Sequence, residues 1–287
     1  MRPEGAADGM GRGMVDDGGR FDLEGYLSRL GVTERPDPTL AYLTLISRAQ
    51  SESIPFENLD PLAGVPVRLD PDSIWDKTVT RRRGGYCFEL NLLLAQAMRA
   101  IGFNATPMLA RVIMGRPDVG PRGHLLHVVD LPEGEHLVDV GFGGPGFVEP
   151  IPLEAGTVFS QDGVDFRLAT PVAGEYLLQR MTAEGWLDLY CFDRSRVVPL
   201  DIEMANFFYS THPMVPFTNQ LMCMFYDAEG LFGFREGALV YFNTDLSVRR
   251  REELDGSEHL ARVLDEQFGL AVPPDLIKRV WQRLQPK

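Results

Sequence analysis

The stretch "RRRGGYCFELN" (residues 81–91) places a cysteine directly after a glycine pair, where an apolar helical pattern begins. The pattern continues to Ile101, and Gly102 follows in the position where helices commonly stop. A thiol at a helix N-terminus lies beside unpaired N–H groups and the positive end of the helix dipole, and both favour the thiolate. Cys87 is therefore the candidate nucleophile.

Helical patterns also precede this stretch, from residue 21 onwards, whereas short apolar segments typical of strands follow Gly102. Three of these segments are 105–114, 124–131 and 136–142. Two more, 175–182 and 186–192, are joined by a short turn that predicts a hairpin. From about residue 201 the chain mixes further strands with two terminal helices. Helices followed by strands, and then by a mixed segment, predict an α+β fold rather than an alternating βαβ fold.

Composition excludes several classes of function. The chain has 287 residues and a formal net charge of −13, which repels phosphate backbones and makes a nucleic-acid partner unexpected. No apolar run approaches the roughly 20 residues that span a bilayer. Residues 1–20 are rich in Gly, Asp and Arg and lack the apolar segment of a signal peptide, so we expect a disordered tail.

The chain contains three cysteines, Cys87, Cys191 and Cys223, which are far apart in sequence. Such an odd and sparse set argues against a disulfide framework and against a cysteine-rich zinc site. We therefore expect a reduced, cytoplasmic protein without a bound metal. Cys191 and Cys223 are expected to be buried and inert.

A nucleophilic cysteine needs a base and a group that orients the base. His124 and His127 lie on one expected strand and Asp139 on the next, and an aspartate beside a histidine can fix its tautomer and stabilise the imidazolium. Because the two histidines are three residues apart, they point to opposite faces of a strand, so they cannot both serve one site. This also weakens an HxxH metal site. The pattern alone does not choose between them.

Each of these residues also has an ordinary structural interpretation. A cysteine at a helix start is commonly a small buried hydrophobe, and a strand histidine is commonly a hydrogen-bonded core residue. A run of arginines is typical of a solvated patch or of salt bridges. Arg83 and Glu89 are accordingly expected to form buried structural pairs around the nucleophile.

Four motifs that occur in a characteristic order favour the catalytic interpretation over the structural one. "IPFENLDPLAGVPVRLD" (54–70), "RRRGGYCFELN", "RGHLLHVVDLPEGEHLVDVGFGG" (122–144) and "DIEMANFFYSTHPMVPFTNQL" (201–221) resemble the landmarks of the arylamine N-acetyltransferases. The resemblance runs from about residue 21 almost to the end of the chain. It implies an N-terminal helical bundle (21–102), a central β-barrel (103–200) and a C-terminal α/β lid (201–287), with a papain- and transglutaminase-like catalytic core.

The resemblance also implies roles for single residues. The family's nucleophile falls on Cys87, its histidine on His124 rather than His127, and its aspartate on Asp139. The implied reaction moves an acetyl group from acetyl-CoA, through an acetyl-cysteine, to the nitrogen of an arylamine, arylhydroxylamine or hydrazine. Backbone N–H groups near Cys87 would hold the oxyanion.

The binding residues are inferred in the same way. Phe56 and Phe142 are expected to wall the acceptor pocket, with Phe208 as a third candidate; for all three, ordinary core packing is the alternative. In the "GFGG" loop, the residues expected to approach the donor phosphates are Gly141, Gly143 and Gly144.

Two positions depart from the family's pattern. Gly123 stands where the family commonly has a threonine before its histidine. Val215 replaces a hydroxyl residue associated with coenzyme A, and Thr218 is the candidate to substitute for it.

Alternative functions stay open. The chain also resembles the amide synthases that close macrolactams from a polyketide held on an acyl carrier protein, and Val215 and the acidic composition fit such a donor. A papain-like hydrolase and a non-catalytic binding protein are further alternatives. The amine preferred and the choice between monomer and homodimer are not set by the sequence.

Overall fold

The computed structural model describes residues 21–116, 120–227 and 229–285. The tail expected at residues 1–20 lies outside the described residues. Within the described ranges, no helix is both long enough and apolar enough to cross a membrane.

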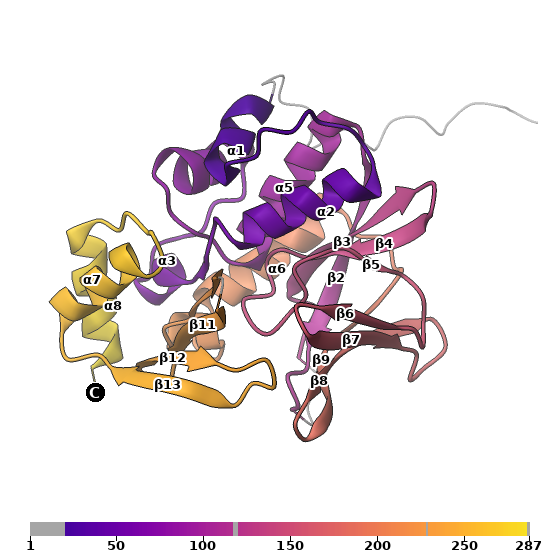
Figure 1. The fold of residues 1–287 in the computed structure, drawn as a ribbon. Helices are drawn as coiled ribbons and strands as arrows, with labels where there is room; N and C mark the ends of the chain where they lie inside the picture. The colour runs from indigo at the N-terminus through magenta and orange to yellow at the C-terminus, as the bar shows by residue number, and fades with distance from the viewer. Residues whose placement is uncertain (1–20, 117–119, 228, 286–287) are drawn as a thin grey trace, which may run out of the picture.

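The N-terminal part is helical and surrounds α5 (Figure 1). Local sequence starts its helices: the Asp22 side chain accepts a hydrogen bond from the Gly25 N–H, Thr39 caps the next helix, and Asp70 precedes a proline at the first helical position. These helices pack their apolar faces into one core cluster with α5. The elements are α1 (Leu23–Leu30), α2 (Leu40–Ser51), α3 (Leu59–Leu62), α4 (Pro71–Trp75), a π-helical turn η1 (Asp76–Thr80) and α5 (Cys87–Ile101).

The central part is a curved antiparallel sheet. Among the described residues it has eight strands, in the order β5-β4-β3-β2-β9-β8-β7-β6. The sheet curls around an apolar core that includes Leu126, Phe166 and Leu189, which forms a barrel-like interior. The strands are β2 (Asn104–Val112), β3 (His124–Leu131), β4 (Gly134–Val138), β5 (Ile151–Pro152), β6 (Val158–Gln161), β7 (Val164–Ala169), β8 (Glu175–Thr182) and β9 (Gly185–Asp193).

The C-terminal part combines α6 (Pro199–Thr211), a 3-10 turn η2 (Pro216–Thr218) and a second sheet in the order β1-β10-β11-β12-β13. β1 comes from the N-terminal part and pairs with β10, so this sheet joins the N-terminal part to the C-terminal part. Two terminal helices cover this sheet's core together with α3. The remaining elements are β1 (Phe56–Glu57), β10 (Cys223–Asp227), β11 (Gly230–Arg235), β12 (Ala238–Phe242), β13 (Val248–Glu253), α7 (Ser257–Glu266) and α8 (Pro274–Leu284).

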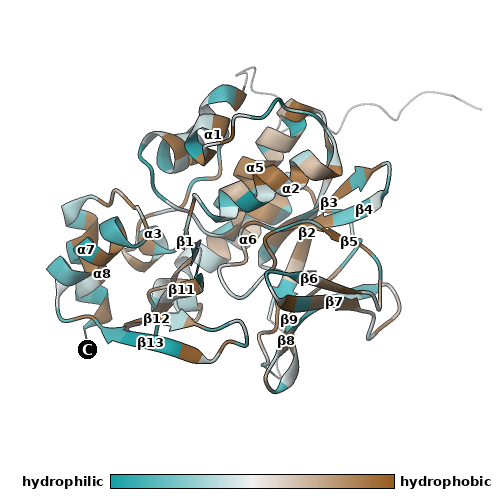
Figure 2. Ribbon diagram, in the orientation of Figure 1, coloured by the Kyte–Doolittle hydropathy of each residue, from teal (hydrophilic) through white to brown (hydrophobic). Residues whose placement is uncertain are grey.

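The structure confirms the α+β fold but corrects several local expectations. The helix α6 is not predicted by the sequence pattern, because its apolar residues lie on both sides: Ile202 and Ala205 are buried, while Met204 and Phe207 are more than 70% exposed. Asp139 lies just beyond the end of β4 rather than within a strand. β13 was also missed, because its residues are mostly charged, as the hydrophilic colouring of Figure 2 shows. Their side chains are mostly exposed on an edge strand.

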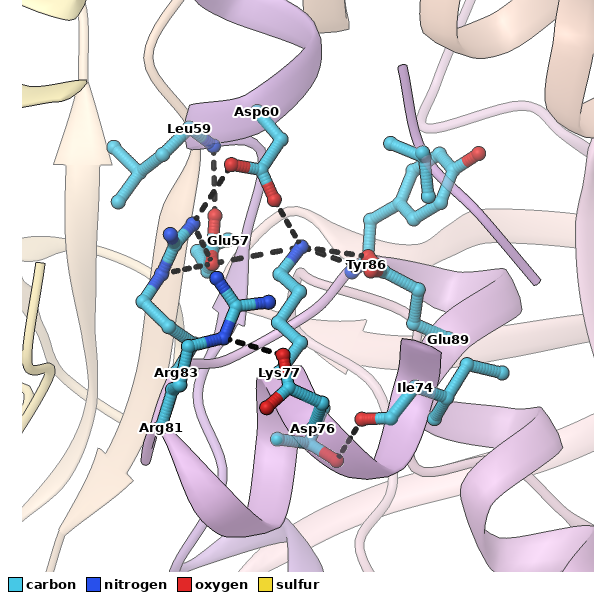
Figure 3. Close-up of polar contacts among 12 residues, drawn as sticks. Glu57, Leu59, Asp60, Ile74, Asp76, Lys77, Arg81, Arg83, Tyr86 and Glu89 are labelled. Carbon is cyan, nitrogen blue, oxygen red and sulfur yellow. Dashed lines mark hydrogen bonds and ion pairs between the residues drawn. The ribbon is translucent and has the colours of Figure 1, made fainter. Parts of the chain in front are cut away.

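A buried ion cluster surrounds the start of α5 (Figure 3). The Arg83 guanidinium donates to a Glu57 oxygen from Nε at 3.0 Å, and the Lys77 ammonium lies 2.7 Å from Asp60 and 2.8 Å from Glu89. The expected buried pairing is confirmed for both residues, since Arg83 pairs with Glu57 and Glu89 pairs with Lys77. We call these five residues the ion cluster.

Removal of one cation from the ion cluster should destabilise the fold strongly. We expect Arg83→Met to lower the free energy of unfolding by about 3–5 kcal/mol, because the Glu57 carboxylate would lose its closest buried cation. Urea unfolding followed by circular dichroism measures this. The matched control is Arg81→Met: Arg81 pairs with Asp76 at 2.8 Å with both side chains more than half exposed, so a loss of at most about 1 kcal/mol is expected. Equal losses in both variants would contradict the prediction.

Candidate active site

Cys87 is the first residue of α5, where the sequence predicts it. The glycine pair before it serves close packing: a Cβ on Gly84 would lie 2.2 Å from the Pro55 carbonyl oxygen, and one on Gly85 would lie 2.8 Å from the Glu89 Cβ. Neither glycine has the positive φ of a tight left-handed turn. The Glu89 carboxylate accepts a hydrogen bond from the Tyr86 N–H at 3.1 Å and so fixes the start of the helix.

His124 and Asp139 meet beside the start of α5. The ring Nε2 of His124 lies 2.6 Å from Asp139 Oδ2, and both side chains are buried. Burial alone would lower the pKa of His124, but the Asp139 carboxylate and hydrogen bonding with Cys87 outweigh it and raise that pKa to about 10. The Cys87 sulfur also lies 3.7 Å from the Gly123 carbonyl oxygen. The structure thus brings the three predicted residues together.

Asn91 holds the aspartate in place and was missed by the sequence analysis. Its amide donates to Asp139 Oδ1 at 3.0 Å and to the Leu125 carbonyl at 2.7 Å, while its oxygen accepts from the Val140 N–H at 3.2 Å. Burial would raise the pKa of Asp139, but His124, Asn91 and the Gly141 N–H outweigh it and lower that pKa. Asn91 lies one helical turn after Cys87, so its spacing was a usable signal.

His127 does not join this group. It lies in the β3–β4 ladder opposite Val138, and it is buried. Burial lowers its pKa to about 4, against a smaller opposing effect of Asp139, so the ring is neutral at neutral pH. The geometry therefore separates the two histidines that the sequence pattern leaves equivalent.

Aromatic side chains line the other sides of the group. Phe142 contacts the His124 ring edge-on at a centroid distance of 5.3 Å, and Tyr190 contacts it at 5.0 Å. Phe142 and Phe56 both border a cavity of about 30 Å³ that also reaches Asp139. Phe208 lies elsewhere, stacked on His212 at 4.6 Å, and does not border this cavity.

The "GFGG" loop packs tightly against the site. A Cβ on Gly141 would lie 2.9 Å from the Cys87 Cα, and one on Gly143, which has a φ of +66°, would lie 2.4 Å from the Phe56 ring. Gly144 lies beside the Phe142 ring. Packing within the protein is therefore sufficient to explain Gly141 and Gly143, and their approach to donor phosphates stays a prediction.

Side chains from two other parts of the fold hold the segment after these glycines. Arg180 of β8 donates to the Pro145 carbonyl at 3.1 Å and to the Thr244 carbonyl at 2.8 Å. The Tyr226 hydroxyl of β10 lies 3.0 Å from the carbonyl oxygens of Gly144 and Gly146. The loop beside the candidate site is thus fixed by both sheets.

The remaining predicted residues lie around the C-terminal part. The Thr218 hydroxyl lies 3.1 Å from the carbonyl oxygens of His212 and Val215, and its predicted contact with a donor stays a prediction. Cys191 and Cys223 are both buried, and burial raises the pKa of Cys191 to about 11 and that of Cys223 well above its usual value. In the part of the chain that the structure describes, no group of three or more His, Cys, Asp or Glu is placed to hold a metal.

Comparison with known proteins assigns the family. The sequence model of a family described as N-acetyltransferase matches residues 39–277. An arylamine N-acetyltransferase of Mycolicibacterium smegmatis is 35% identical over 256 residues, which cover 87% of this chain and 92% of that protein. The chain belongs to the arylamine N-acetyltransferase family. The resemblance drawn from the motifs is thereby confirmed.

Further members agree with this assignment. A Salmonella typhimurium protein named arylamine N-acetyltransferase / N-hydroxyarylamine O-acetyltransferase is 34% identical over 252 residues, covering 87% of this chain and 89% of that protein. The Mycobacterium marinum arylamine N-acetyltransferase solved in complex with CoA superposes with a TM-score of 0.84 at 32% identity, covering 92% of this chain and 98% of that one.

A proansamycin X synthase of Amycolatopsis mediterranei matches over a shorter range. It is 31% identical over 176 residues, which cover 60% of this chain and 67% of that protein. The amide synthase alternative thus has a partial match, whereas the acetyltransferases match over nearly the whole chain.

The neutral buried His127 predicts a loss of stability in mild acid. Its pKa is lowered to about 4 in the folded protein and is about 6.5 when unfolded, so the unfolded state binds the proton first as pH falls through this window. By pH 4 this should remove about 3 kcal/mol of unfolding free energy. His127→Phe should lack this part of the pH dependence, as measured by urea unfolding between pH 4 and 8. Parallel curves for variant and wild type would contradict the prediction.

Proposed function

We propose that Cys87, His124 and Asp139 carry out the family's acetyl transfer from acetyl-CoA to arylamines, arylhydroxylamines or hydrazines. The observation that supports this most directly is the 2.6 Å contact between His124 and Asp139, placed where the ring also meets the Cys87 sulfur. Such a constellation has the nucleophile, base and orienting group that acyl transfer needs. For arylhydroxylamines the oxygen is a second acceptor, in line with the name of the Salmonella relative.

The resting site holds an imidazolium paired with the Asp139 carboxylate. Because the pKa of His124 is raised to about 10, the ring is protonated at neutral pH, and an imidazolium beside a cysteine favours reaction of the cysteine sulfur as the thiolate. In the first half-reaction the sulfur attacks the thioester carbonyl, the bond between the acetyl carbon and the CoA sulfur breaks, and the CoA thiolate takes the proton from His124. Acetyl-Cys87, neutral His124 and free CoA result.

In the second half-reaction the acceptor nitrogen attacks the acetyl carbon, and neutral His124 takes the proton from that nitrogen. The bond to the Cys87 sulfur breaks, and the thiolate–imidazolium pair returns. Asp139 stabilises the imidazolium and holds the ring by its other nitrogen. We assign the oxyanion formed in both steps to backbone N–H groups at the start of α5, where helix geometry leaves them without internal partners.

The binding roles follow from position. Phe56 and Phe142, which border the cavity at Asp139, are the proposed walls of the acceptor pocket. The "GFGG" loop and Thr218 are the proposed contacts with the donor, and Phe208 stays the weakest-placed of the aromatic candidates because it stacks on His212 instead. Location in the cytoplasm, a monomer or homodimer, and the division into a bundle, a barrel and a lid are proposed on the sequence arguments above.

A second candidate function has one observation in its favour. The partial match to proansamycin X synthase, together with Val215 in place of a hydroxyl residue, fits an acyl group delivered by a carrier protein. This amide synthase would use the same thiolate and the same acyl-cysteine. Peptide hydrolysis and a binding protein without activity have no such support.

The covalent acetyl-cysteine can be detected directly. Intact-protein mass spectrometry after brief incubation with acetyl-CoA should show a gain of one acetyl group, discharged by an added arylamine. Cys87→Ala should show none, whereas Cys191→Ser, which removes a buried thiol of raised pKa, should behave as wild type. If Cys87 is alkylated by iodoacetamide but takes no acetyl group from acetyl-CoA, the donor assignment is wrong and the carrier-protein function is favoured.

The role of the orienting carboxylate can be tested by a single substitution. Asp139→Asn keeps the shape of the side chain but removes the charge that holds His124 protonated, so we expect acetylation of Cys87 to slow by about 10³–10⁴-fold. Quenched-flow mass spectrometry of the acetyl-enzyme measures the rate. A variant within tenfold of wild type would show that Asp139 has only a structural role.

A further inference from the structure

The Tyr209 ring of α6 fills the space where a side chain at position 123 would lie. A Cβ on Gly123 would lie 1.7 Å from Tyr209 Cε2 and 2.0 Å from its Cζ. Gly123 does not have a left-handed φ, so its backbone would admit any side chain. The tyrosine ring is therefore the reason for glycine at this position, where the family commonly has threonine.

The ring lies against Gly123, whose backbone approaches the nucleophile. The Gly123 carbonyl oxygen is 3.7 Å from the Cys87 sulfur, and His124, the first residue of β3, directly follows Gly123. Burial raises the pKa of the Tyr209 hydroxyl, and Cys87 adds to the rise. Cys87 itself is only 3% exposed, so an acyl group on its sulfur has to fit among the side chains already around it.

The ring is held on several sides. Its hydroxyl donates to the Pro121 carbonyl at 3.1 Å, and its ring contacts Phe208 and Phe217 at centroid distances of 5.4 and 6.1 Å. Phe217 in turn contacts Tyr86, the residue before the nucleophile. Tyr209 is thus a fixed wall rather than a loose surface side chain.

We propose that Tyr209 is a specificity-determining residue that limits the length of the acyl group accepted at Cys87. The inference rests on the acyl-cysteine of the proposed function and adds which acyl groups form it. A threonine at position 123 would place a small side chain just before β3, whereas Tyr209 places a larger ring there from α6. Since one methylene in a close-fitting pocket changes rates by about 10–200-fold, a ring at this place favours short acyl groups.

The test compares acyl chain lengths at Cys87. Wild type, Tyr209→Ala and Tyr209→Phe are each incubated with acetyl-CoA and hexanoyl-CoA, and the acylation rates are followed by intact mass. Tyr209→Ala should raise the ratio of hexanoyl to acetyl rates at least tenfold, because the ring is gone. Tyr209→Phe keeps the ring and should keep the wild-type ratio, as should Met204→Ala, a change at an exposed position of the same helix. An unchanged ratio in Tyr209→Ala would overturn the proposal.

A double variant tests whether the Tyr209 ring is the reason for glycine at position 123. Gly123→Ala should slow acetylation at least tenfold, because its methyl group meets the ring, and adding Tyr209→Ala should restore most of the rate. A double variant as slow as Gly123→Ala alone would overturn the pairing.

A parallel measurement separates this inference from the proposed function. Alkylation of Cys87 by iodoacetamide and by N-hexyl iodoacetamide needs no acyl donor, and Tyr209→Ala should raise the relative rate of the longer reagent. If CoA thioesters fail to acylate wild type while this size effect persists, the donor assignment fails and Tyr209 keeps its role. If the size effect is absent from alkylation, Tyr209 does not limit access to the sulfur.

Discussion

The ion cluster at the start of α5 is the constraint on which the site depends. Glu57 joins Arg83 to the segment that pairs with β10, and Glu89 joins Lys77 to the backbone N–H just before Cys87. Buried ion pairs add little net stability, because the charges lose their hydration, but a wrong arrangement leaves a charge unpaired at high cost. The cluster therefore selects one position for the nucleophile relative to the second sheet, and Figure 3 shows how closely its groups converge.

Sequence reasoning succeeded where one physical signal dominated. The α5 helix has a long apolar pattern with a glycine stop, and the β8–β9 hairpin has a short turn between two apolar runs, so both were predictable. It failed at α6, whose exposed apolar residues hide the buried face, and at β13, whose pairing to β12 is not written in its charged sequence. Tertiary contacts decide both elements.

The candidate site was also predictable only in part. The place of Cys87 at a helix start was visible in the sequence, but the choice of His124 over His127 required either a family resemblance or the folded geometry. Periodicity cannot distinguish two histidines on a strand with two apolar faces, whereas the contact with Asp139 distinguishes them at once. The contact between Tyr209 and Gly123 could not be predicted for a related reason. The two residues are far apart in the chain, and a single glycine gives no periodic signal.

The pairing of β1 with β10 also sets the order in which this protein can be completed. Asn58 bonds to Met222 across 164 residues, so the segment before the nucleophile waits for its partner until most of the chain has been made. At ribosomal rates of 5–20 residues per second that delay is roughly 8 to 33 s. The helical part and Cys87 leave the ribosome first, and α6 with Tyr209 leaves much later. A nascent chain therefore carries its thiol for many seconds before the side chains from α6 and β10 that surround the site have been made.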